Sequence, residues 1–174
     1  MPILILADQP PPPPQGIALQ TLDGWNVPNS LDNLPGDRAV KLAEMAYGAL
    51  AARSRRLSGR TRYNCHGLTF GARRTSIPPP GEDDDGVVRE ILRRDGYHRV
   101  ASTPRVGDVV TYVKEGKITH RGLVSRIESL QLSSPGGPPH VFVWSAWGGF
   151  GEFEHRADGM EDFYGRPEYW RVTP

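Results

Sequence analysis

The sequence predicts an α+β fold in which N-terminal helices pack on a small antiparallel β-sheet of about five strands. Helical periodicity dominates the chain before Pro104, and short apolar runs separated by turns dominate it afterwards. Helices followed by an antiparallel meander are typical of this fold class. The 174 residues suit one domain, so we expect a proline-rich arm at residues 1–34 and the folded unit at 35–174.

The N-terminal arm carries five consecutive prolines, Pro10 to Pro14. Such a run forms an extended polyproline II rod, which acts as a spacer, as a packing arm or as an SH3-type ligand. The apolar start, Met1 to Asp8, is short and lacks the basic region of a secretory signal, and no stretch reaches the roughly 18 apolar residues that span a membrane. We expect a cytoplasmic protein as synthesised, with signal-independent secretion as the alternative.

Three helices are expected in the first half of the chain. The first covers residues 37–53, with Asp37 as its cap and an apolar stripe that consists of Leu42, Met45, Ala46, Ala49 and Leu50. The second begins at residue 64 or 65 and ends near residue 74. The third spans residues 84–95, with aspartates at its start and arginines near its end.

The strands follow the helices. They are expected at residues 106–113, 118–128, 140–147, 152–155 and 169–172. A Lys-Glu-Gly-Lys turn makes the first two antiparallel, and a Ser/Pro/Gly loop at 133–139 leads to the third. The glycine-rich segment 148–151 follows a strand but does not lead into a helix, so it does not match a phosphate-binding loop.

The net charge is +1, so the surface as a whole is not built to bind nucleic acid. Local charge is less even, because a basic run precedes an acidic one; these runs are Arg53, Arg55, Arg56, Arg60 and Arg62, then Glu82, Asp83, Asp84 and Asp85. The basic run is interpreted as a solvated loop rather than a nucleic-acid site, because few aromatic residues are interleaved for base stacking. We therefore expect neither a nucleic-acid partner nor a membrane partner.

The chain has one cysteine, Cys65, in the segment Tyr-Asn-Cys-His-Gly-Leu at residues 63–68. It cannot form an internal disulfide or a multi-cysteine zinc site, so it is either a packed thiol or a nucleophile with a histidine partner. Its place after Asn64, a good capping residue, favours the nucleophile, because a helix N-terminus and a nearby imidazole lower the pKa of a thiol. Gly67 leaves room for a sheet or a substrate to approach.

Two histidines are candidate partners of the thiol. His66 is adjacent to it, but neighbouring side chains on a helix point about 100° apart, so His66 is expected to be structural or to form the rim of the site. His120 lies 55 residues after the cysteine, at the head of a predicted strand, and is the expected partner. A zinc site is the alternative, but no ligand pair has the usual spacing and we expect no metal or cofactor; its ligands would be His120, His140, His155 and Asp108.

These residues occur in an order that resembles the NlpC/P60 group of papain-like cysteine hydrolases. The matching segments are Tyr-Asn-Cys-His-Gly-Leu at 63–68, Pro-Arg-Val-Gly-Asp-Val-Val at 104–110 and His-Arg-Gly-Leu-Val at 120–124. The resemblance covers about residues 60–128 well and the later strands in outline. It implies a papain-like fold with Cys65 as nucleophile, His120 as general base and acid, and the backbone N–H of Cys65 as an oxyanion donor.

The resemblance also implies a third polar residue, on the strand after that of His120, that orients the imidazole. Antiparallel pairing puts Ser145 at this position, where the family usually has histidine, asparagine or glutamine. Glu152 or His155, on the next strand, are the alternatives. A second departure is His66, where family members generally carry serine, and it bears on the substrate class.

Aromatic residues follow the third strand. Trp144 is expected in the sheet core, whereas Trp147 and Phe150 belong either to the core and a flexible hairpin or to the wall of a substrate groove with residues 148–151 as a movable lip. The candidate substrate-binding residues are therefore Tyr63, His66, Gly67, Trp147 and Phe150.

The leading hypothesis is a cysteine hydrolase that cleaves a peptide or isopeptide-type amide bond through a thioester on Cys65. One form is a cell-wall amidase or endopeptidase that acts on peptidoglycan. Another is a secreted toxin-type effector that acts on a protein substrate and is held by an inhibitor or immunity protein. A deamidase, an acyltransferase and a catalytically silent binding module are the alternatives.

Overall fold

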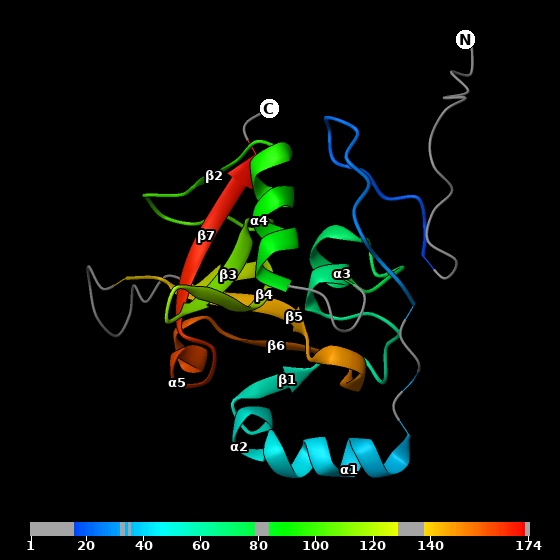
Figure 1. Cartoon of the computed structure of the whole chain (residues 1–174). Helices are drawn as coiled ribbons and strands as arrows, with labels where there is room; N and C mark the ends of the chain where they lie inside the picture. Colours follow the sequence, from blue (N-terminus) through cyan, green and yellow to red (C-terminus); the bar gives the residue numbers. More distant parts are fainter. Residues whose placement is uncertain (1–15, 32–33, 35, 79–83, 129–137, 173–174) are drawn as a thin grey trace.

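The structure is a computed structural model of the chain, and it describes residues 16–31, 34, 36–78, 84–128 and 138–172. Within these residues the fold is mixed α/β, with an open antiparallel sheet of seven strands and five helices (Figure 1). The expectation of about five strands was wrong. Two three-residue strands, β1 (Ser54–Arg56) and β2 (Tyr97–Arg99), extend the two edges of the sheet.

The other five strands lie close to where the sequence predicts them. They are β3 (Val109–Lys114), β4 (Lys117–Glu128), β5 (His140–Ala146), β6 (Glu152–Arg156) and β7 (Arg166–Val172). The order in the sheet is β1-β6-β5-β4-β3-β7-β2, and all neighbours are antiparallel. The strand that carries His120 is therefore the central one.

A β-bulge in β4 decides which way His120 faces. Tyr112 pairs with His120 but Val113 pairs with Ile118, so Thr119 is an extra residue without a partner position on β3. Alternation of side chains is interrupted at such a bulge. As a result Ile118 and His120, although two residues apart, belong to different faces of the sheet: Ile118 packs against α4, and His120 packs beside Tyr112.

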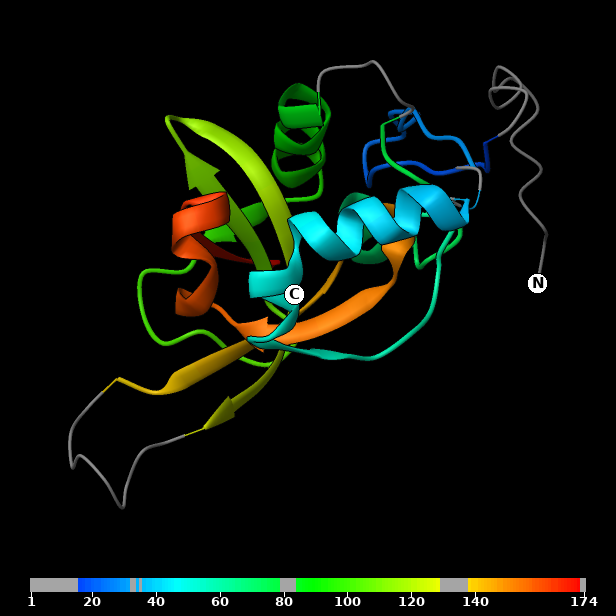
Figure 2. The same cartoon turned by 90° about the horizontal axis from the view of Figure 1, so that it is seen from below.

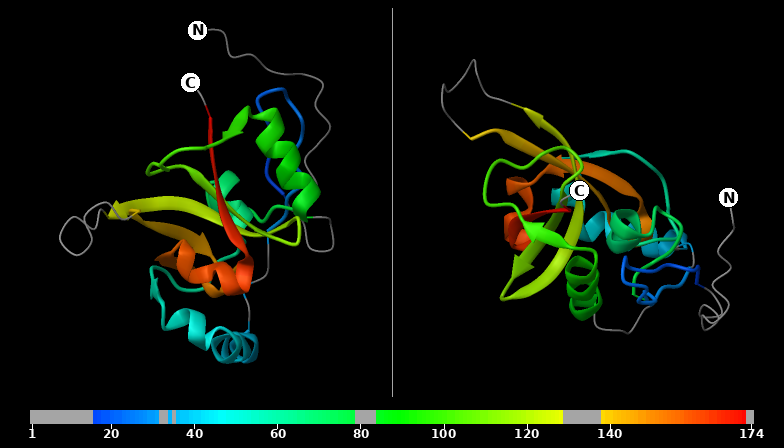
Figure 3. Two further views of the ribbon diagram at one scale, coloured as in Figure 1. Left: turned by 90° about the vertical axis from the view of Figure 1, so that its left-hand side faces the viewer. Right: turned by 90° about the horizontal axis from the view of Figure 1, so that it is seen from above.

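Helices cover both faces of the sheet. On one face, Val88 and Leu92 of α4 (Asp84–Arg94) pack against Val109 and Ile118. On the other face, α1 (Asp37–Ala46), α2 (Gly48–Ala51) and α5 (Glu161–Tyr164) surround a core that includes Tyr112, Val143, Phe153, Leu50 and Met160. The left view of Figure 3 shows α4 on one side of the strands and α1 with α2 on the other.

The third element of the helical layer is α3 (Cys65–Phe70), which packs on β4 and β5. It is shorter than the helix predicted to reach residue 74, because the N–H groups of Gly71 and Arg73 both bond to the carbonyl of Gly67 and the chain turns away. By contrast, α4 agrees closely with the helix predicted at residues 84–95.

The helix predicted at residues 37–53 is broken in two. Tyr47 separates α1 from α2, and Gly36 rather than Asp37 is the cap residue of α1. The apolar stripe was also misplaced, because Leu42 and Met45 are 59% and 81% exposed while Leu50 is buried. The break turns the ring of Tyr47 towards Trp147, at a centroid distance of 5.7 Å. Tyr47 thus makes the core contact that the stripe was expected to make.

The predicted N-terminal arm contains a segment that is packed into the core. Val27 is 4% exposed and belongs to a cluster with Ile77 and Ile91. Asn29 accepts a hydrogen bond from the hydroxyl of Thr75 at 2.7 Å. The polyproline run Pro10–Pro14 and most of the loop at 133–139 lie outside the described residues. None of the helices in the described part of the chain is long and apolar enough to cross a bilayer.

The close packing of α3 against the loop at Thr75 generates a first prediction. A Cβ at Gly67 would lie 1.7 Å from the backbone oxygen of Thr75, so the neighbouring loop would have to move. Overpacking of this kind costs about 3 kcal/mol. We expect Gly67→Ala to lower the free energy of unfolding in urea by that amount. The matched control is Gly48→Ala, whose Cβ would meet nothing within 4 Å; an equal loss in both variants would contradict the packing described here.

Candidate functional site

The candidate nucleophile lies at the first position of α3, and Asn64 fixes it there. The side-chain oxygen of Asn64 accepts from the backbone N–H of Gly67 at 2.9 Å and from that of Ile77 at 3.2 Å, and its amide donates to the carbonyl of Ile77 at 3.0 Å. Its own N–H donates to the hydroxyl of Ser76 at 3.1 Å. The cap therefore ties the start of the helix to a second loop, and Cys65 is held in place with 8% of its surface exposed.

The room predicted beside Gly67 is taken by the protein itself. The carbonyl of Thr75 occupies it, so the close approach is made by the loop after α3 and not by a sheet or a substrate.

His120 is buried in a cage of rings on the opposite side of β4 from α4. Its imidazole stacks on Tyr164 at a centroid distance of 4.2 Å, and Tyr112 and His155 lie at 5.9 and 6.5 Å. Its Nε2 atom is buried and has no hydrogen-bond partner among the described residues. Burial lowers the pKa of His120 well below its usual value, and His155 and Arg121 lower it further. The ring is therefore neutral at neutral pH, with one unused nitrogen.

Tyr164 borders the candidate base His120. Its ring stacks on that of His120, and burial raises its pKa, with Tyr47 and Cys65 adding to the rise. Cys65 therefore acts electrostatically on the phenol that covers His120. Sequence reasoning missed Tyr164, which lies between the last two predicted strands without any pattern that marks it.

His66 is a buried residue that contacts Arg121. It is 3% exposed, and its Nδ1 atom contacts Nη1 of Arg121. A guanidinium only donates hydrogen bonds, so Nδ1 must accept and the proton of the ring sits on Nε2. Burial, Arg121 and His120 all lower the pKa of His66. These contacts agree with the structural role expected for it, and its burial leaves it no place at the rim of a substrate site.

Ser145 is bonded to His155, not to His120. Nδ1 of His155 lies 3.1 Å from the carbonyl of Arg156, which can only accept, so the proton is on Nδ1 and Nε2 accepts from the hydroxyl of Ser145 at 3.0 Å. The register explains the difference, because Ser145 lies beside Gly122 rather than beside His120. Of the two alternatives, His155 is the one whose ring borders His120.

Glu152, the other alternative, belongs to a separate cluster. Its carboxylate accepts from the hydroxyl of Tyr63 at 2.5 Å and from the indole of Trp144 at 3.3 Å, and it pairs with Arg73 at 3.1 Å. Arg73 also covers the Trp144 ring at 4.0 Å. Tyr63 is therefore a partner of Glu152, and this contact connects the segment before Cys65 to β6.

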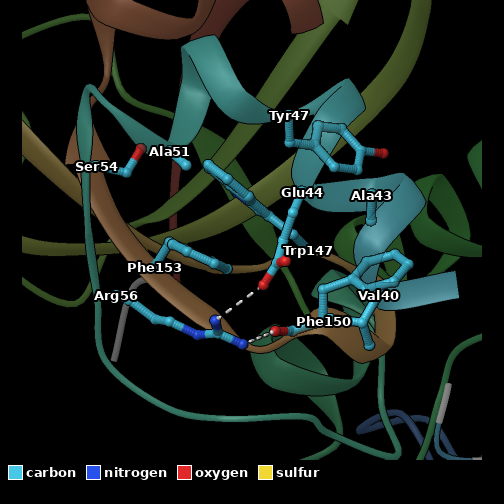
Figure 4. A pocket seen from close by; sticks show the side chains of 10 residues that line it. All are labelled: Val40, Ala43, Glu44, Tyr47, Ala51, Ser54, Arg56, Trp147, Phe150 and Phe153. Carbon is cyan, nitrogen blue, oxygen red and sulfur yellow. Dashed lines mark hydrogen bonds and ion pairs between the residues drawn. The ribbon is translucent and has the colours of Figure 1, made fainter. Parts of the chain in front are cut away.

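An apolar pocket of about 190 Å³ opens between α1 and the β1–β6 edge of the sheet (Figure 4). Figure 2 looks onto α1. Three residues of this helix, Val40, Ala43 and Glu44, line one side of the pocket. The pocket contains both aromatic residues predicted to wall a groove, and its lining is Val40, Ala43, Glu44, Tyr47, Ala51, Ser54, Arg56, Trp147, Phe150 and Phe153. Trp147 stacks on Phe153 at 4.0 Å, and Tyr47 is the second aromatic wall.

The pocket adjoins the ring cage. Trp147 lies 6.4 Å from His155 and Tyr47 lies close enough to raise the pKa of Tyr164. At the rim, Arg56 donates to the carbonyl of Phe150 at 2.9 Å. The segment 148–151, expected either as a flexible hairpin or as a movable lip, contains a 3-10 turn at Gly148–Phe150 that this contact holds in place.

Within the described residues, no group of three His, Cys, Asp or Glu side chains is arranged to hold a metal ion. Asp108, one of the residues considered for zinc, is instead bonded to Arg171 at 2.6 and 2.7 Å. We also compared the chain with protein-family models, with curated proteins and with solved structures, and none of the three comparisons found a match.

The buried histidines generate a prediction on acid stability. Burial lowers the pKa of His155 from 6.5 to about 4, so between these values the unfolded chain binds a proton that the folded protein does not. Stability is therefore lost as the pH falls from 6.5 to about 4, by about 3 kcal/mol for this residue alone.

We expect His155→Gln to weaken the pH dependence by this amount in urea unfolding at pH 7, 6, 5 and 4. The control is His98→Gln, which replaces an exposed histidine. If the free energy of unfolding fell with pH by the same amount in wild type and in His155→Gln, His155 would not be buried in its neutral form.

Proposed function

We propose that this protein is a papain-like cysteine hydrolase that cleaves an amide bond, with Cys65 as nucleophile and His120 as general base and acid. The observation that carries the proposal is the unused Nε2 atom of a neutral His120 under the ring of Tyr164, whose pKa Cys65 helps to raise. A neutral imidazole with a free nitrogen is the form that accepts a proton.

The chemistry follows from these two groups. Nε2 of His120 takes the proton of the Cys65 thiol as Sγ forms a bond to the carbonyl carbon of the substrate. The protonated imidazole then gives this proton to the leaving nitrogen as the C–N bond breaks, which leaves a thioester. Water, deprotonated by His120, attacks the thioester and restores the thiol. A lowered pKa makes the protonated His120 a strong acid towards the leaving amine.

The resemblance of the sequence to the NlpC/P60 group supports the same assignment. It matches the segments around Cys65 and His120, and α3 with the antiparallel strands β3 to β6 supplies a helix-on-sheet arrangement of the kind the resemblance implies. In the third position we propose His155, rather than Ser145, as the polar neighbour of His120, with Ser145 fixing the ring of His155.

The apolar pocket indicates the part of the substrate that is recognised. It is lined by aromatic and small apolar side chains, with one arginine and one glutamate at its rim. One of its walls, Trp147, also lies near His155, a member of the ring cage around His120. A pocket of this character binds a large apolar side chain. We therefore propose a peptide or protein substrate with such a residue near the scissile bond.

A catalytically silent binding module is the second candidate, and one observation favours it. Cys65 and His120 are only 8% and 4% exposed. A substrate therefore reaches these two side chains only if the residues that cover them move. The same pocket would then hold a peptide without cleaving it.

Turnover measurements separate the two candidates. With a library of internally quenched peptides, and with ammonia release as a separate readout for deamidation, we expect Cys65→Ala and His120→Gln each to lower turnover roughly a thousandfold or more. His98→Gln serves as the control. Unchanged turnover in Cys65→Ala would rule out the hydrolase, and binding without any turnover by the wild type would support the silent module.

The pocket makes a prediction on substrate choice. We expect Phe150→Ala to raise KM about tenfold for peptides with a large apolar residue and to leave kcat largely unchanged, because it removes one wall of the pocket but no reacting group. Phe163→Ala, which truncates an exposed phenylalanine on α5, is the matched control. Equal KM values for Phe150→Ala and wild type would show that the substrate does not use this pocket.

A further inference from the structure

Arg121 is the largest fully buried side chain described in this protein, and its relative exposure is 0%. It follows His120 on β4, so the two side chains leave the strand on opposite faces. A guanidinium does not lose its proton at any physiological pH. Burial of a charge is costly unless its surroundings compensate for it. The interior of this protein therefore contains a permanent positive charge next to the proposed general base.

The position of this charge is set by His66. Nη1 of Arg121 contacts Nδ1 of His66, which is the residue directly after Cys65 in α3. Since α3 packs on β4, the guanidinium lies beneath the first turn of the helix that carries the proposed nucleophile. No substrate can touch it there, so any effect on the reaction must act through the electric field.

The neighbouring groups show the sign of this field. Arg121 contributes to the lowered pKa of both His66 and His120, because a positive charge opposes protonation of an imidazole. The same charge favours a thiolate. With His66 and His120 neutral, neither ring supplies a positive charge to a sulfur anion before the proton is transferred.

The other titratable groups around this region do not replace Arg121. They are Tyr164 on α5, Tyr47 between α1 and α2, Tyr112 on β3, His155 and Glu152 on β6, and Tyr63 in the segment before α3. Tyr63, Tyr112 and Tyr164 are neutral at neutral pH because burial raises their pKa values, and His155 is neutral because burial lowers its pKa. Glu152 carries a negative charge, and Arg73 is paired with it.

We propose that Arg121 is the electrostatic positioning residue of the site: its buried guanidinium stabilises the negative charge on Sγ of Cys65 and makes protonated His120 a stronger acid. This inference rests on the proposed function, since it assigns a role in the same reaction. A guanidinium within about 8 Å of a sulfur anion at an effective dielectric constant near 20 shifts the pKa of the thiol by roughly one unit.

The test measures the pKa of Cys65 without any substrate, from the rate of alkylation by iodoacetamide between pH 5 and 10. The wild-type thiol should titrate below the ordinary value of about 8.5. Arg121→Met should raise the pKa by roughly one unit and slow alkylation at pH 7 up to about tenfold. Arg121→Lys, which keeps a positive charge, should restore much of the shift, whereas a purely structural role would not distinguish lysine from methionine.

Two further readouts keep the outcomes distinct. A wild-type pKa near 8.5, or a low pKa that is the same in wild type and Arg121→Met, would overturn only the role of Arg121, whereas unchanged turnover in Cys65→Ala would overturn the proposed function itself. If Arg121→Met does not fold, the wild type is tested instead by the ¹⁵N chemical shifts of its histidine rings as a function of pH. The proposal expects the ring of His120 to stay neutral over the pH range in which the thiol of Cys65 ionises. An imidazolium that titrates together with the thiolate would show that His120, not Arg121, is the counter-charge.

Discussion

The cap formed by Asn64 is the constraint on which the site depends. One short side chain and its backbone N–H bond to the first turn of α3 and to the loop at Ser76 and Ile77, so the start of the helix cannot move independently of that loop. Gly67 closes the arrangement, since the Thr75 carbonyl fills the space of its missing side chain. With α3 seated in this way, Cys65 has a fixed place above the sheet and His66 is directed to Arg121.

The second constraint is electrostatic. The protein buries three imidazoles in one region, and burial lowers the pKa of each of them. Burying a neutral imidazole costs less free energy than burying a charged one, and the neutral ring keeps one nitrogen that can accept a proton. His66 and His155 use that nitrogen for Arg121 and Ser145, whereas Nε2 of His120 remains unused among the described residues. This difference is the reason why we propose His120, rather than His66 or His155, as the base.

The sequence predicts the framework of this site better than its details. The helix at 84–95 and the central strands have strong periodicity and clear turns, and the structure has them with small changes at their ends. The placement of Cys65 at a helix start also follows from local signals, because Asn64 is a good cap.

The details depend on register and tertiary packing, which local patterns do not encode. Ser145 was assigned to His120 by counting along antiparallel strands, but the pairing of Leu123 with Trp144 places it beside Gly122, and the register of β4 against β5 shifts between Val124 and Arg126. The stripe with Leu42 and Met45 failed because the helix breaks at Tyr47. Arg121 carried a usable signal, since a charged residue within a buried strand requires a partner inside the protein.

The central claim is that the thiol of Cys65 and Nε2 of His120 act on each other. The most direct measurement is a crystal structure of the protein after reaction with a chloroacetamide-bearing peptide. The account predicts a covalent bond from Sγ of Cys65 to the peptide, with Nε2 of His120 within hydrogen-bond reach of that sulfur. An adduct whose sulfur lies far from His120, or no adduct on Cys65 at all, would contradict it.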